Sequence, residues 1–223
     1  MTQTADRDRL SHLVGVIHEA LEQKGLTSER CLFATTILID LAVRIGFESY
    51  RWEGSAIWYN RKYIEIKNSG YDFKGLAKLP PEKREKRLQA LEKKGMRSIH
   101  CLANEGDLNV DLGGHLCVVA SKNGHSYFID PTCHQFKRTP KLPELPGSIL
   151  APKYIVSIID HTTTPEINFL HPYNGGMGVY LHEPVNRYRQ MMALPETERA
   201  DTDLNPRRHP DLDEYLLHLL KIT

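Results

Sequence analysis

Three residues whose types can carry out nucleophilic chemistry together occur in the order cysteine, histidine, aspartate: Cys31, His115 and Asp130. A thiolate attacks an acyl carbon, and an imidazole takes the thiol proton and later protonates the leaving group. A carboxylate fixes the tautomer of that imidazole and stabilises its charged form. The pattern predicts a cysteine-dependent acyl transfer with Cys31 as the nucleophile, His115 as the base and Asp130 as the residue that orients it.

Cys31 is predicted to lie at the start of a central helix. Residues 31–45 are apolar on nearly every helical face, which is typical of a helix buried by its surroundings, and Gly46 ends the run. With Ser28 as the N-cap, the thiol lies in the first turn. Backbone N–H groups without partners and the positive end of the helix dipole stabilise a thiolate there. Cys31 is therefore the first choice as nucleophile, although a small buried core residue is the alternative interpretation.

The other two residues lie on a predicted β-hairpin. Two apolar or alternating runs, 115–120 and 125–130, lie on either side of an Asn-Gly pair, which is the strongest short-range hairpin signal. With this pair as a two-residue loop, His115 lies diagonally across from Asp130 on one face, within reach of a side-chain contact. The register therefore predicts an imidazole beside a carboxylate.

Further residues are candidates for contacts around this site. Cys117 faces Asp130 in the same register, so it lines the site or packs beneath it, and it is the second choice as nucleophile. Acyl transfer also needs a donor to the developing oxyanion, for which the backbone N–H of Cys31 is the default. Side-chain donors from Gln23, Trp52 or Tyr59 are alternatives among which the spacing does not choose. Trp52, Tyr59 and Cys117 are the predicted substrate-binding residues.

These residues together resemble the transglutaminase-like superfamily of papain-fold cysteine enzymes. The resemblance rests on the run from Cys31 to Gly46 followed by strands, on His115 opening a strand, and on Asp130-Pro131-Thr132 fifteen residues after His115. It covers about residues 28–66 and 112–133. The resemblance implies an α+β, papain-like core in which a central N-terminal helix packs on an antiparallel sheet, with the same three catalytic residues.

The resemblance implies an enzyme acting on an amide or thioester, of the peptidase, amidase or deamidase, or transglutaminase type. Two alternatives stay open. Arylamine N-acetyltransferases share the logic of the triad, and a non-catalytic binding protein could retain the fold. The expected partner is a protein, a peptide or a small acyl substrate, and the oligomeric state is not predicted.

The whole chain is predicted to divide into a catalytic domain over residues 1–164 and a C-terminal extension over 165–223. The catalytic domain contains a polar insertion at about 67–112. Periodicity predicts further elements: a packing helix at 8–24, two strands at 47–52 and 57–66 around a turn at Glu53-Gly54, a basic helix at 82–94, a strand at 154–159, a turn at 174–176, a helix starting near Pro184 and a last helix at 211–221.

Composition narrows the class of protein. Lys and Arg number 29 and Asp and Glu 28, so the net charge of +1 gives no field that would attract nucleic acid. Four cysteines in 223 residues are too few for a disulfide scaffold, and no secretion signal or membrane span is apparent. Histidines and cysteines are dense at 100–134 but lack zinc-knuckle spacing. We therefore expect a soluble cytoplasmic protein with reduced thiols, no metal, no cofactor, and no nucleic acid or membrane as partner.

Overall fold

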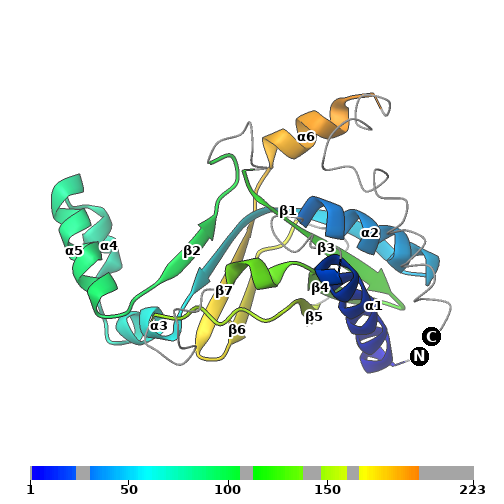
Figure 1. Cartoon of the computed structure of the whole chain (residues 1–223), viewed down its shortest axis with the longest axis horizontal. Helices are drawn as coiled ribbons and strands as arrows, with labels where there is room; N and C mark the ends of the chain where they lie inside the picture. Colours follow the sequence, from blue (N-terminus) through cyan, green and yellow to red (C-terminus); the bar gives the residue numbers. More distant parts are fainter. Residues whose placement is uncertain (1, 24–30, 106–112, 138–146, 160–165, 196–223) are drawn as a thin grey trace.

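The computed structural model describes residues 2–23, 31–105, 113–137, 147–159 and 166–195 (Figure 1). In this part of the chain, helices surround one antiparallel sheet in the strand order β5-β4-β3-β1-β7-β6, with β2 also paired to β1. The class is α+β, as predicted. The strands are β1 (Glu48–Tyr59), β2 (Ser98–Cys101), β3 (His115–Lys122), β4 (His125–Asp130), β5 (Ile155–Ile159), β6 (Phe169–Tyr173) and β7 (Gly176–His182). The helices are α1 (Gln3–Gln23), α2 (Cys31–Arg44), α3 (Arg61–Asn68), α4 (Phe73–Ala77), α5 (Pro81–Lys93), the 3-10 turn η1 (Cys133–Phe136) and α6 (Asn186–Ala193).

The long strand β1 replaces the two strands and the turn predicted at Glu53-Gly54, so that prediction is wrong. Gly54 lies inside the strand, where a Cβ would come within 2.1 Å of the carbonyl oxygen of Leu181 on β7. The glycine therefore serves a close approach of two strands rather than a turn. The predicted second strand is also wrong beyond Tyr59, because Asn60 accepts a hydrogen bond from the backbone N–H of Tyr63 and starts α3.

The predicted hairpin of β3 and β4 is confirmed. Lys122 pairs with His125, and the register continues to Val118 opposite Ile129. Asn123 and Gly124 have φ angles of 52° and 76°. Positive φ at both loop positions is what a type I′ turn requires, and Asn and Gly tolerate it best.

The two faces of the sheet carry separate cores. On one face α1 and α2 pack against β3, β4 and β5, where Val118 and Ala120 are buried (Figure 1). On the other face Cys117 and Val119 pack with Trp52, among other residues, beneath η1 and the segment that follows it. Alternate residues of β3 thus point into different cores, as the two-residue period of a strand requires.

His115 lies at an interruption in the sheet. Gly54 pairs with both His115 on β3 and His182 on β7, so these two strands lie on opposite edges of β1. Ala56 pairs with both Cys101 on β2 and Tyr180 on β7. Strands β2 and β3 therefore follow each other along one edge of β1, and the first residue of β3 faces the gap between them.

The polar insertion begins at the end of α3 and contains α4, α5 and β2, and α4 and α5 stand at one end of the molecule (Figure 1). The predicted basic helix is confirmed as α5. It is anchored by a small cluster of its own, in which Leu76, Leu91 and Met96 are buried. Helices α4 and α5 lie away from α2, so they do not position the predicted triad (Figure 1).

Residues 166–195 contribute to the same sheet as the N-terminal strands. Strands β6 and β7 form a hairpin whose turn contains Asn174 and Gly175, with φ angles of 48° and 77°. The turn was predicted, but the two strands beside it were not. Strand β7 pairs with β1, and α6 follows close to the predicted helix start. Ser28 and the helix predicted at 211–221 lie outside the described residues. No described helix has the length and apolar character that crossing a membrane requires.

Candidate active site

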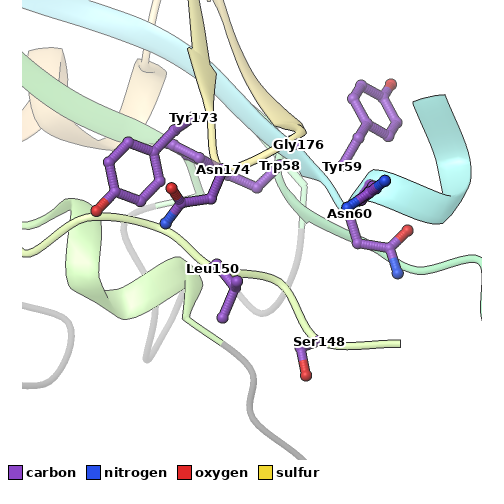
Figure 2. A pocket seen from close by; sticks show the side chains of 9 residues that line it. Trp58, Tyr59, Asn60, Ser148, Leu150, Tyr173, Asn174 and Gly176 are labelled. Atoms are coloured by element: carbon purple, nitrogen blue, oxygen red, sulfur yellow. The ribbon is translucent and has the colours of Figure 1, made fainter. Parts of the chain in front are cut away.

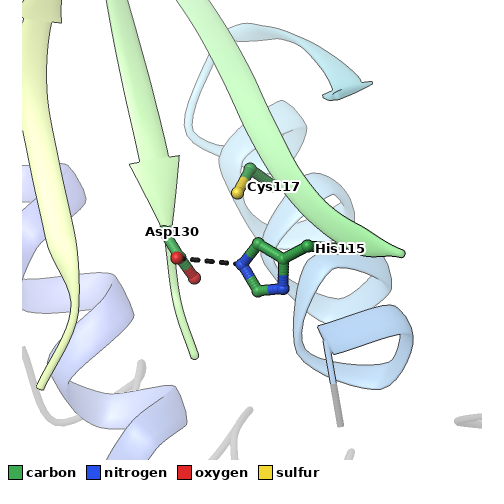
Figure 3. A group of neighbouring side chains, drawn as sticks. All are labelled: His115, Cys117 and Asp130. Carbon is green, nitrogen blue, oxygen red and sulfur yellow. Dashed lines mark hydrogen bonds and ion pairs between the residues drawn. The ribbon is translucent and has the colours of Figure 1, made fainter. Parts of the chain in front are cut away.

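His115 and Asp130 form a fully buried pair at the ends of β3 and β4 (Figure 3). Nε2 of His115 lies 2.9 Å from Oδ2 of Asp130, and both side chains are 0% exposed. The hairpin register brings them together, so the predicted contact is confirmed. Because Nε2 is bound to the carboxylate, Nδ1 is the ring nitrogen left to exchange a proton with another group.

The sequence after Asp130 supplies hydrogen bonds to its carboxylate. Oδ1 accepts the backbone N–H of Thr132 at 2.9 Å and its hydroxyl at 3.4 Å. Oδ2 accepts the hydroxyl of Tyr180 at 2.8 Å in addition to the bond from His115. Burial alone would raise the pKa of Asp130, but the charge of His115 and these hydrogen bonds outweigh it and lower the pKa. Asp130 is therefore held as a carboxylate.

The charge on Asp130 acts in the opposite direction on the imidazole. Burial alone would lower the pKa of His115, but the Asp130 carboxylate outweighs it and raises the pKa well above the ordinary value of 6.5. The buried pair therefore favours imidazolium beside carboxylate.

Gln135 and Phe136 of η1 complete the surroundings of the imidazole ring. Nε2 of Gln135 lies 2.9 Å from Nδ1 of His115. The ring of Phe136 meets the imidazole edge to face, with 5.1 Å between ring centroids. Sequence reasoning missed both residues, and it also missed Tyr180. Gln135 lies five residues after Asp130. A tight turn after Asp130-Pro131-Thr132 would have indicated that the chain folds back over the ring.

Cys31 is the first residue of α2 and lies beside the start of β3. It is 7% exposed and forms a small apolar cluster with Leu32 and Leu116, the residue that follows His115. Tyr188 and Met191 of α6 pack against this cluster. The alternation along β3 directs Leu116 toward α2 and the ring of His115 toward the other face of the sheet. In this arrangement Nδ1 of His115 is bonded to Gln135.

Cys117 lies between these groups. One ligand atom each from His115, Cys117 and Asp130 lies within 4.8 Å of the others (Figure 3). Burial strongly raises the pKa of the Cys117 thiol, and electrostatic interactions with Asp130 and with Cys31 raise it further. Cys117 is thus held as a neutral thiol, which makes it a poor nucleophile. Cys31 is close enough to Cys117 to act on it electrostatically, which places the start of α2 near the cluster.

The same three residues could in principle hold a metal ion. Their hydrogen bonds argue against it, because Nε2 of His115 and both carboxylate oxygens of Asp130 are already bonded within the protein. A metal would have to displace these bonds, and the Cys117 thiol would have to lose its proton. The donor set therefore fits a hydrogen-bonded pair better than a metal centre.

The structure places the predicted substrate-binding and oxyanion residues at different distances from the pair. Trp52 is buried beneath it, with its indole N–H donated to the carbonyl of Ile167 at 2.8 Å. Tyr59 ends β1 five positions beyond Gly54, the partner of His115, which is about 16 Å along a strand. Gln23 is the last residue of α1. Cys117 is the predicted contact residue that lies directly beside the pair.

Tyr59 instead lines a small pocket at the far end of β1 (Figure 2). The pocket has a volume of about 30 Å³, which is room for ordered water. Trp58 lies in its wall and also donates its indole N–H to the hydroxyl of Tyr180 at 3.3 Å. Trp58 and Tyr180 therefore link this pocket to Asp130 through two hydrogen bonds.

All four cysteines are free thiols. Cys101 donates a hydrogen bond to the carbonyl of Gly114 at 3.1 Å, next to His115. Cys133 accepts a contact from the hydroxyl of Tyr180 at 3.7 Å. The two cysteines without a predicted role thus both lie close to the pair.

Comparisons of the chain with protein-family models, with curated proteins and with solved structures found no match. The resemblance to the transglutaminase-like superfamily accordingly stays a prediction based on its motifs.

Proposed function

We propose that this protein is a cysteine-dependent acyl-transfer enzyme with a papain-like core and Cys31, His115 and Asp130 as its triad. The observation that supports the proposal best is the buried bond of 2.9 Å between His115 and Asp130. Burying two charged groups costs free energy that their mutual attraction rarely exceeds, so stability alone does not explain why this pair is buried. Orienting an imidazole for proton transfer is a function that requires this arrangement.

The proposed reaction has two stages. In the proposed reaction the ring of His115 turns Nδ1 toward the start of α2 and, in its neutral form, accepts the proton of the Cys31 thiol. The sulfur then forms a bond to the acyl carbon of an amide or thioester. The bond from that carbon to the leaving group then breaks, and the imidazolium protonates the leaving group. In the second stage His115 removes a proton from water or an amine, which attacks the acyl-enzyme and releases the thiol.

The first test compares Cys31 with Cys101 as an internal control. Cys101 is partly exposed whereas Cys31 is 7% exposed, so accessibility alone predicts faster alkylation of Cys101 by iodoacetamide. If Cys31 is an activated nucleophile, it is alkylated faster than Cys101 at pH 7, and His115→Gln removes the advantage. Cys31 reacting no faster than Cys101 would contradict the proposal.

The second test asks for acyl transfer itself. p-Nitrophenyl acetate offers an activated acyl group, and attack by a thiolate transfers acetyl to sulfur with release of p-nitrophenolate. We expect one acetyl group on the intact protein, located on Cys31 by peptide mapping and absent from Cys31→Ala. Supplying an amine in place of water then separates transferase activity from hydrolysis. Acetylation that persists unchanged in Cys31→Ala would contradict the assignment.

A non-catalytic binding protein is the second candidate, favoured by how closed the site is. The side chain of His115 is 0% exposed, and Cys31 is covered by Tyr188 and Met191. A protein that retains the fold to bind a partner would not need access to these groups. Slow alkylation of Cys31 together with no acetyl transfer would favour this candidate.

A further inference from the structure

Gln135 contacts the ring nitrogen that the proposed reaction needs. Its carboxamide lies 2.9 Å from Nδ1 of His115, while Asp130 binds Nε2 on the other side of the ring. The backbone N–H of Gln135 donates to the carbonyl of Thr132 at 3.1 Å, which closes the tight turn of η1. A single short segment, residues 130–135, therefore holds both nitrogens of the imidazole.

A carboxamide suits this position because it offers both a donor and an acceptor. The N–H of Gln135 can donate to Nδ1 of a neutral ring, and its oxygen can accept Nδ1–H of an imidazolium after the amide turns over. Gln135 can therefore keep a hydrogen bond to His115 in either protonation state. A hydrophobic residue at this position would offer neither bond.

Among the described titratable groups next to His115, Asp130 is the one that is charged near pH 7. Cys117 on β3, Cys133 on η1 and Tyr180 on β7 all have a pKa raised by burial, and each stays neutral near pH 7. The protonation state of His115 thus depends on Asp130 at Nε2 and on whichever group meets Nδ1. Gln135 is that group in this structure.

We propose that Gln135 is a positioning residue that caps Nδ1 of His115 in the resting protein and must leave it before His115 can accept the proton of Cys31. The inference rests on the proposed function, because a proton acceptor is needed at Nδ1 only if Cys31 is the nucleophile. The proposed reaction needs the nitrogen that Gln135 occupies and needs the ring to turn from η1 toward α2, so Gln135 both holds the ring in register and slows the reaction until a substrate displaces it.

The experiment measures the rate of Cys31 alkylation by iodoacetamide against pH in the full-length protein. Gln135→Ala removes the competitor, so we expect alkylation to be faster by about fivefold, the factor that one ordinary hydrogen bond contributes. Gln89→Ala is the matched control, because Gln89 lies exposed on α5 and bonds only to Glu85 among the described residues. An unchanged or slower rate in Gln135→Ala, with the thermal unfolding midpoint retained, would overturn the inference.

A second variant tests the positioning role without relying on Cys31. In Gln135→Glu a carboxylate meets Nδ1 and stabilises the imidazolium, so the pKa of His115 should rise by about one unit. The pKa is read from the ¹⁵N shifts of the labelled imidazole rings, with the His115 signals assigned through His115→Gln. A His115 titration identical in wild type, Gln135→Ala and Gln135→Glu would show that Gln135 does not cap Nδ1.

The two readouts separate this inference from the proposed function. If the Gln135 variants change the ¹⁵N shifts of His115 while Cys31 reacts no faster than Cys101 in any of them, the cap is confirmed and the triad is wrong. The braking role of Gln135 is then wrong as well. If Cys31 reacts fast in the wild type but neither readout responds to the variants, the triad stands and the role of Gln135 is overturned.

Discussion

Tyr180 donates a hydrogen bond to Oδ2 of Asp130 at 2.8 Å, although 50 residues separate the two in the chain. The same hydroxyl accepts the indole N–H of Trp58 at 3.3 Å. A chain of hydrogen bonds therefore runs from Trp58 through Tyr180 and Asp130 to His115. These residues lie on the four neighbouring strands β1, β7, β4 and β3. Linked bonds of this kind polarise one another and fix a buried charge in one place.

Replacing the hydroxyl tests how much this chain contributes to stability. Tyr180→Phe removes a bond to a buried carboxylate and leaves Trp58 without its acceptor. We expect the free energy of unfolding to fall by about 2 kcal/mol in urea denaturation. Tyr127→Phe is the control, because Tyr127 is also buried but donates to a neutral backbone carbonyl, that of Gln3, at 3.1 Å. A loss in Tyr180→Phe no larger than in Tyr127→Phe would contradict the special role of Tyr180.

The parts of the site that sequence could predict are those set by local geometry. The Asn-Gly loop fixes the register of β3 and β4, and the register alone brings His115 to Asp130. Tyr180 and Gln135 reach the same pair through a distant strand and a tight turn, for which no local pattern specifies the direction. Gly54 was wrongly predicted to form a turn. In the sequence, a glycine that allows two strands to pack closely looks the same as a glycine that allows a turn.

The relation of Cys31 to the pair depends on tertiary structure in the same way. Helical periodicity predicts α2, and the described helix Cys31–Arg44 agrees with it. The side of the sheet on which α2 packs depends on how β3 alternates, which the hairpin register leaves open. The structure places Cys31 against Leu116, one residue after His115, and that neighbour relation could not be derived from spacing.

The His115 and Asp130 pair predicts a particular dependence of stability on pH. The pKa of His115 is raised in the folded protein, so its contribution is fully present below the ordinary value of 6.5 and is lost as pH rises through the raised pKa. Asp130→Asn removes the charge that raises it. We expect wild type to exceed the variant by about 3 kcal/mol or more at pH 6.5 in urea denaturation, and by less as pH rises. A difference that stays constant between pH 6.5 and 9.5 would contradict the assignment.

His18 predicts the opposite dependence, at acid pH. It is 2% exposed, meets the ring of His134 at 4.7 Å between centroids, and lies 3.3 Å from the carboxylate of Glu22. Burial lowers the pKa of His18, and the electrostatic interaction with the neighbouring ring of His134 lowers it further. The folded protein then binds fewer protons than the unfolded chain, so stability falls as pH drops below 6.5.

The measurement for His18 is urea denaturation between pH 7.5 and 5. We expect the free energy of unfolding to decrease over this range in wild type, and the decrease to be smaller in His18→Gln. His12→Gln on the same helix is the control, because His12 is exposed. Equal slopes in wild type and His18→Gln would show that another group causes the loss at acid pH.

The contact between Met191 and the Cys31 cluster predicts that α6 controls access to the thiol. Helix α6 has no buried residue of its own, and Tyr188 and Met191 are the side chains through which it packs on Cys31, Leu32 and Leu116. An element with so little buried surface opens at a small cost in free energy, and shortening the contact lowers that cost further. We therefore expect Met191→Ala to speed the alkylation of Cys31 by iodoacetamide.

Met192 provides the matched control, because it is the next residue on the same helix and is 43% exposed. Met192→Ala removes the same number of atoms from α6 without uncovering Cys31, so its alkylation rate should equal that of wild type. For Met191→Ala we expect an increase of about two- to fivefold, the effect of losing part of one apolar contact. The alkylation rate of Cys101 should change in neither variant. Equal effects of the two substitutions on Cys31 would mean that α6 does not cover the thiol in solution.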